Sequence, residues 1–100
     1  MGSIHIRMGG AMGGGAPVYA TIPNATEEIT STASNTVSTI SAESGDFIRV
    51  KNFGDVGVYI AVGKAPLATI AGKRDRLMPG EFMDLAPASR GDRVAVIDAE

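Results

Sequence analysis

Apolar and polar residues alternate with a period of two over residues 46–62, interrupted by one tight turn. Before the turn, Ile48 and Val50 fall on one face of an extended chain, and the basic residues beside them fall on the other. Gly54 and Asp55 supply the backbone freedom that a turn needs, and aliphatic residues alternate again from residue 56 to residue 62. The pattern predicts two half-buried strands joined as a hairpin.

Short β-forming segments recur along the rest of the chain, separated by Gly, Pro, Asn and Asp, and no segment keeps the 3.6-residue period of a helix. The other expected strands are residues 17–22, 27–32, 36–41, 82–85 and 93–99. Residues 64–76 are expected to form a loop. Six or seven short strands with turn residues between them predict an all-β chain, a small antiparallel β-sandwich or barrel.

Composition divides the chain into a Gly/Met-rich N-terminal arm, residues 1–16, and a single β domain, residues 17–100. The arm holds six glycines, and glycine loses the most conformational freedom on ordering, so we expect the arm to be extended and flexible. It is either a disordered tail or a strap that becomes ordered across a neighbouring subunit. The side chains that such a strap would bury are Ile4, Ile6, Met8 and Met12.

The size of the chain favours self-association. A domain of 100 residues is marginally stable alone, and small folds usually add disulfides, metals or oligomerisation. The chain has no cysteine, and its single histidine, His5, cannot build a metal site without partners. We therefore expect an oligomer.

Charge and residue types argue against several functions. A net charge of −2 offers no basic face for nucleic acid, and no apolar run approaches the roughly 20 residues of a membrane-spanning helix. The carboxylates are scattered, and neither a nucleophile–base pair nor a phosphate-binding motif is present. We expect a protein that is not an enzyme and that uses no metal or other cofactor.

One local group of cations lies in the expected loop, at Lys73, Arg74 and Arg76. It is either an ordinary solvated loop or a docking contact for an acidic surface, where exposed charges set orientation and association rate more than affinity.

Three segments together resemble the small β-rich virion proteins of tailed bacteriophages: "GDFIRVKNFGDVGVYIAVGKAPLAT", "LMPGEFMDL" and "GDRVAVIDA". The resemblance covers roughly residues 26–99 and leaves out the N-terminal arm. It implies a capsid decoration (cement) protein, commonly a homotrimer, whose partner is the major capsid protein. Such a protein is made in the host cytoplasm and ends on the capsid surface of the virion, where it stabilises contacts between capsomers.

Two alternatives stay open. The first is a low-copy structural protein of the phage tail, neck or fibre. The second is a carbohydrate-binding β-module, which would need exposed aromatic side chains on a shallow face, such as Tyr19 and Tyr59.

Overall fold

The structure, a computed structural model, describes residues 2–9, 11–13, 16–18, 25–85 and 88–99. The strands are β1 (Ser3–Met8), β2 (Ala11–Gly13), β3 (Ala16–Val18), β4 (Ala25–Thr30), β5 (Thr36–Val37), β6 (Ile48–Asn52), β7 (Val58–Gly63), β8 (Asp75–Leu77), β9 (Phe82–Leu85) and β10 (Arg93–Asp98). One short 3-10 helix, η1 (Ala71–Lys73), precedes β8.

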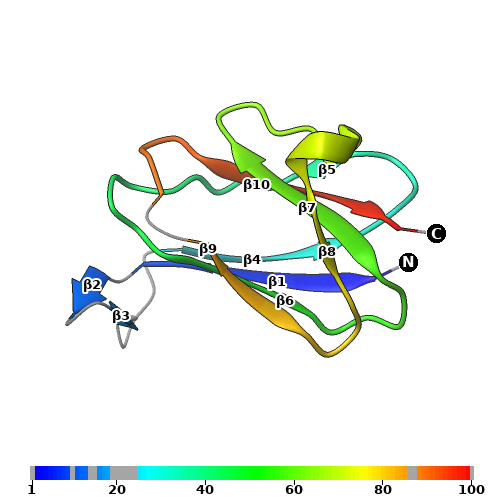
Figure 1. The fold of residues 1–100 in the computed structure, drawn as a ribbon, viewed down its shortest axis with the longest axis horizontal. Coiled ribbons are helices and arrows are strands. Elements are labelled where there is room, and N and C mark those ends of the chain that lie inside the picture. Colours follow the sequence, from blue (N-terminus) through cyan, green and yellow to red (C-terminus); the bar gives the residue numbers. More distant parts are fainter. Residues whose placement is uncertain (1, 10, 14–15, 19–24, 86–87, 100) are drawn as a thin grey trace.

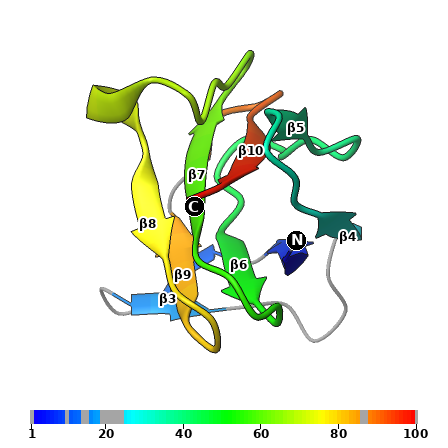
Figure 2. The same ribbon diagram turned by 90° about the vertical axis from the view of Figure 1, so that its right-hand side faces the viewer.

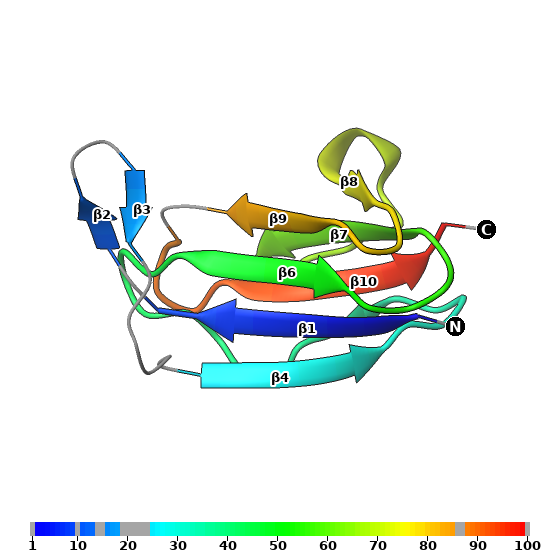
Figure 3. The ribbon, with the colours of Figure 1, turned by 90° about the horizontal axis from the view of Figure 1, so that it is seen from below.

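Eight of these strands form two four-stranded antiparallel sheets, in the orders β4-β1-β6-β9 and β5-β10-β7-β8. The sheets lie face to face as two layers, which Figure 1 shows from the side and Figure 2 from one end. The other two strands, β2 and β3, pair with each other beyond one end of the layers (Figure 3). The chain is an all-β sandwich, as the alternation predicts.

The core lies between the two layers and is built almost entirely from aliphatic side chains. Successive residues of a strand point to opposite faces of the sheet, so every second residue reaches this space. The largest aliphatic side chains of the buried cluster are Ile4, Ile6, Met8, Ile29, Ile48, Val50, Val58, Ile60, Leu77, Val94 and Val96.

The expectation of a flexible arm over residues 1–16 is wrong for residues 3–8. These residues form β1, a central strand that pairs with β4 on one side and with β6 on the other. Ile4, Ile6 and Met8 are fully buried in the core and cannot serve as strap contacts. The physical reason is the alternation Ile-His-Ile-Arg-Met, a strand pattern that the glycine content of the whole segment obscured. Met12 lies in β2, and its side chain is outside the described part of the structure.

This result also moves the domain boundary. The sandwich begins at β1, so residues 17–100 do not contain the whole fold. The β2–β3 ribbon is an excursion between two strands of one sheet, β1 and β4.

β6 and β7 are both present, but the expectation that they pair as a hairpin is wrong, because they belong to different sheets. Residues 53–57 carry the chain from one layer to the other. The buried side chain of Asn52 holds this crossing: its Nδ2 donates to the carbonyls of Val56 at 2.9 Å and Leu77 at 3.1 Å. Its Oδ1 accepts from the N–H of Gly54 at 2.9 Å. One side chain thus ties the connection between the sheets to itself and to β8.

Other expected elements differ in extent. Residues 64–76 contain η1 and the start of β8, not only loop. β5 ends at Val37 because, at the next residue, the side-chain hydroxyl of Ser38 and not its backbone carbonyl accepts the hydrogen bond from the N–H of Val94, at 3.1 Å. Of the strand expected at residues 17–22, the structure describes only the first two residues, within β3.

A buried serine joins the two sheets near the chain ends. The Ser31 hydroxyl accepts from the backbone N–H of Gly2 at 2.7 Å and donates to the Asp98 carboxylate at 2.6 Å. Gly2 leads into β1 of one sheet, whereas Asp98 ends β10 of the other, so this hydroxyl connects both layers.

Candidate functional site

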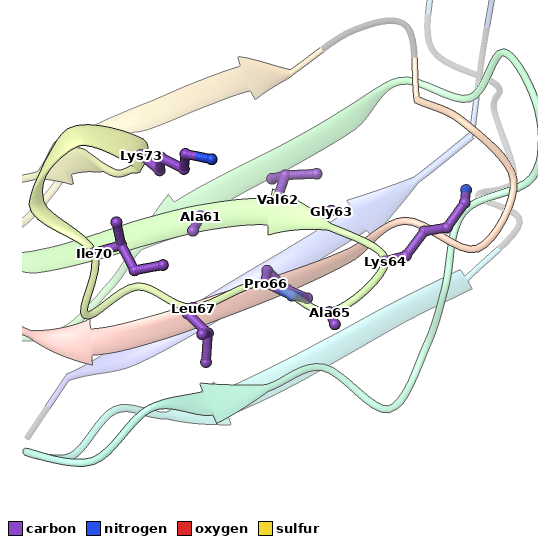
Figure 4. A pocket seen from close by; sticks show the side chains of 9 residues that line it. All are labelled: Ala61, Val62, Gly63, Lys64, Ala65, Pro66, Leu67, Ile70 and Lys73. Carbon is purple, nitrogen blue, oxygen red and sulfur yellow. The ribbon is translucent and has the colours of Figure 1, made fainter.

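A hollow of about 240 Å³ lies where β7 ends and its following loop turns back. Residues 61–67, Ile70 and Lys73 line it. Figure 4 shows that the lining comes from the last residues of β7, from the loop that follows, and from η1. Most of its side chains are apolar, with a lysine on either side.

Small residues and one amide side chain fix the loop that forms the hollow. Ala68 is fully buried and packs with Ala61 of β7 and Ala95 of β10, which lets the loop lie close to the outer face of the sheet. Asn35 holds the loop from the other side: its Oδ1 accepts from the N–H of Ala68 at 2.8 Å, and its Nδ2 donates to the Pro66 carbonyl at 3.3 Å. The hollow therefore sits on a firmly held loop.

The rim of the hollow exposes large aliphatic side chains. Leu67 is 50% exposed, Ile70 44% and Val62 37%. Grouped exposed apolar residues with a charged margin are typical of a surface that contacts another protein. Here Lys64 and Lys73 provide the charged margin, and no acidic side chain is among the lining residues.

The three cations singled out from the sequence differ in their positions and contacts. Lys73 lines the hollow. Arg74 is half-buried: its guanidinium lies 3.6 Å from the centre of the Tyr59 ring, and its Nη1 donates to the Ala68 carbonyl at 3.2 Å. Arg76 is exposed, and its guanidinium lies 5.9 Å from the same ring. Lys73 and Arg76 are therefore displayed at the surface, whereas Arg74 fastens the loop.

The outer face of the other sheet carries a second group of charged and aromatic residues. Arg49 makes a two-pronged ion pair with Asp84, at 2.8 and 3.1 Å, and lies 4.4 Å from the centre of the Phe82 ring. Lys51 lies 4.8 Å from the centre of the Phe53 ring. Both phenylalanines are more than half exposed, but each has a cation over its face.

The described residues offer no evident catalytic constellation. His5 lies on the same outer face as Lys51, its Nδ1 3.8 Å from a carboxylate oxygen of Glu28. A histidine–carboxylate contact without a hydroxyl or thiol nucleophile is not a triad. Within the part of the chain that the structure describes, no group of three His, Cys, Asp or Glu residues could hold a metal ion. Nor does that part contain a helix long and apolar enough to cross a membrane.

Sequence reasoning missed the apolar half of this site. Leu67 and Ile70 fall in a segment expected to be a loop, and loop segments rarely carry several large aliphatic residues. The run "PLATIAG" was therefore an available signal for a contact surface. The role of Asn35 had no such signal, because its partners lie some thirty residues away in the chain.

The chain matches no protein-family model, no curated protein sequence and no solved structure at a significant level. Function is therefore inferred from the fold and from the chemistry of these two surfaces.

Proposed function

We propose that this chain is a structural virion protein of a tailed bacteriophage, a capsid decoration protein that binds the outer shell and stabilises contacts between capsomers. Its partners would be the major capsid protein and further copies of itself, as a homotrimer. It would be made in the host cytoplasm and be found on the capsid surface.

The observation that carries the proposal is the exposed apolar hollow with Lys64 and Lys73 in its lining. A held loop that displays aliphatic side chains between cations suits contact with a protein surface better than turnover of a substrate. The resemblance of residues 26–99 to phage virion proteins indicates that the partner surface is a capsid shell. Single contacts of this size are weak, but a shell presents many equivalent positions, and an oligomer that engages several of them gains avidity.

The contact residues proposed from the sequence need revision. Ile4, Ile6 and Met8 stabilise the core, so the strap has no apolar side chains in β1. Contact is reassigned to Leu67, Ile70 and Lys73. Met12, in the β2–β3 ribbon that extends beyond the sandwich, stays a predicted contact (Figure 3).

The copy number of this chain in purified virions tests the proposal, measured by quantitative mass spectrometry relative to the major capsid protein. Hundreds of copies are expected for a shell decoration protein. A few copies per particle would instead indicate the tail, neck or fibre. Absence from the particle would refute every virion role.

A matched pair of variants tests the surface. Purified Ile70→Ser is expected to lose attachment to undecorated capsids in a co-sedimentation assay, because Ile70 lines the hollow. Phe53→Ser removes an even more exposed apolar side chain, 59% against 44% for Ile70, next to the end of β6 in the other sheet, and is expected to attach normally. The reverse result would place the contact on the outer face of the β4-β1-β6-β9 sheet.

Carbohydrate binding is the second candidate, and the exposed Phe53 and Phe82 rings are the observation that favours it. Sugars stack on aromatic faces, but Lys51 and Arg49 already cover one face of each ring. A glycan array probed with the labelled protein separates the two functions, and we expect no specific glycan to bind.

A further inference from the structure

One edge of β7 is left unpaired at its end. β10 pairs with β7 along its whole length, from Val58 to Gly63. On the opposite side β8 pairs only with the first half of β7, and its first residue, Asp75, lies opposite Ile60. Within the described chain, no strand pairs with residues 61–63 on that side.

The backbone of Val62 faces this open edge. In an antiparallel ladder, residues alternate between bonding to the neighbouring strand and pointing both backbone groups away from it. Val94, opposite Val62, directs both its N–H and its carbonyl to Ser38 on its far side. The pair of Val94 and Val62 is therefore of the type without hydrogen bonds. The N–H and the carbonyl of Val62 point away from β10, toward the side where β8 is missing.

The hollow adjoins the same edge. Residues 61–63 belong to its lining, so an added strand would place a side chain among Leu67, Ile70 and the end of β7. Figure 4 shows the side chain of Lys73 extending from η1 alongside the end of β7. The structure gives the Lys73 ammonium no hydrogen bond to any described residue, whereas the Lys64 ammonium donates to the Arg90 carbonyl at 2.7 Å.

We propose that the end of β7 accepts an extended peptide segment with alternating apolar and acidic side chains, which adds to the sheet as a short strand. The backbone of Val62 would donate and accept one hydrogen bond each, as in other cases of strand addition. An apolar side chain would enter the hollow, and a carboxylate would pair with Lys73. The charge of the partner follows from the lining, which contains two lysines and no acid.

This inference deepens the proposed function by giving the chemistry of the partner segment, and it rests on that function only for the identity of the protein that carries it. A strand edge on a capsid protein is one source of such a segment. A second copy of this chain is another occupant to be tested, and its presence would overturn the assignment to a different protein.

The test uses the purified full chain and a fluorescein-labelled hexapeptide of alternating Glu and Leu, capped at both ends, with fluorescence anisotropy as the readout. Saturable binding is expected. Two further peptides carry N-methyl groups on either the Glu or the Leu amides. Because alternate residues of a strand direct their N–H groups to opposite edges, each peptide can no longer pair through one of its two edges. At least one of them is expected to bind about tenfold more weakly, because two backbone hydrogen bonds are lost. Unchanged binding of both would refute strand addition.

Charge is tested by a matched pair of variants. Lys73→Gln is expected to weaken binding of the Glu/Leu peptide about threefold, the size typical of one exposed ion pair. Lys51→Gln removes the same charge from the outer face of the other sheet and should leave binding unchanged. A Lys/Leu peptide should bind more weakly than the Glu/Leu peptide, and equal binding would refute the choice of an acidic partner.

The two proposals fail separately. If virions contain many copies but no Glu/Leu peptide binds, the strand-acceptor inference fails alone. If the peptide binds and virions lack the chain, the virion role fails alone. If the peptide dissociates an oligomer of the chain, as measured by sedimentation velocity, the occupant is a second copy and the assignment to a different protein is wrong.

Discussion

Replacement of Asn52 by Ala is expected to be among the most damaging single changes in the polar part of the structure. The Asn52 side chain is fully buried and makes three hydrogen bonds, to the carbonyls of Val56 and Leu77 and from the N–H of Gly54. Each such bond contributes about 1 kcal/mol net, and a buried group that loses its partner costs about 1–3 kcal/mol. The expected loss in the free energy of unfolding is therefore about 3–5 kcal/mol, a large part of the roughly 5–15 kcal/mol available to a domain of this size.

The assay is urea denaturation followed by far-ultraviolet circular dichroism, repeated at several protein concentrations to separate folding from association. Asn35→Ala is the matched control. Asn35 also makes two side-chain hydrogen bonds to backbone groups, but it is only half-buried, so water can replace the lost partners. We expect it to cost about 1 kcal/mol. If Asn52→Ala destabilises the protein no more than Asn35→Ala, the assignment of the crossing between sheets to Asn52 is wrong.

Three further changes test other parts of the fold. Ile6→Ala is expected to lower the free energy of unfolding by about 2–5 kcal/mol, because Ile6 is fully buried in β1. A negligible effect in the same denaturation assay would mean that residues 3–8 are a flexible arm after all. Gly54→Ala places a Cβ 2.5 Å from the Cα of Gly2, so it should lower the melting temperature clearly, whereas Gly72→Ala meets no atom within 4 Å and should leave it unchanged or raise it. Ser31→Ala removes the link between the sheets and should lower the free energy of unfolding by about 1–3 kcal/mol. Amide hydrogen exchange measured by mass spectrometry should become faster at residues 2–4 and 96–99, and exchange rates there that do not change would contradict this role.

Local alternation predicted the strands well, since it reports which residues share a face. Val58 and Ile60 face the core as expected from their spacing. Alternation does not report which strand pairs with which, and for this reason β6 and β7 were expected to be partners. Asn52, whose side chain holds the connection between them, donates to the carbonyl of Leu77, a residue far along the chain.

The N-terminal strand was missed for a different reason. The six glycines of residues 1–16 are typical of a flexible segment, but five of them follow Met8 and leave the alternation of residues 4–8 intact. The site was found only in part. Lys73 stood out by its charge, but the open edge at Val62 exists only because β8 begins opposite Ile60, and no local pattern specifies where a neighbouring strand begins.

The central position of β1 has a consequence for how the chain folds during synthesis. β1 is synthesised before both of its neighbours, β4 and β6, and the register joins Ile6 to Glu27 on one side and to Val50 on the other. Folds dominated by such distant pairings form slowly, in roughly milliseconds to seconds, because long loops must close before contacts stabilise them. A nascent chain therefore keeps Ile4, Ile6 and Met8 exposed until the residues of β6 have been added, and chaperone binding to the nascent chain is expected at this segment.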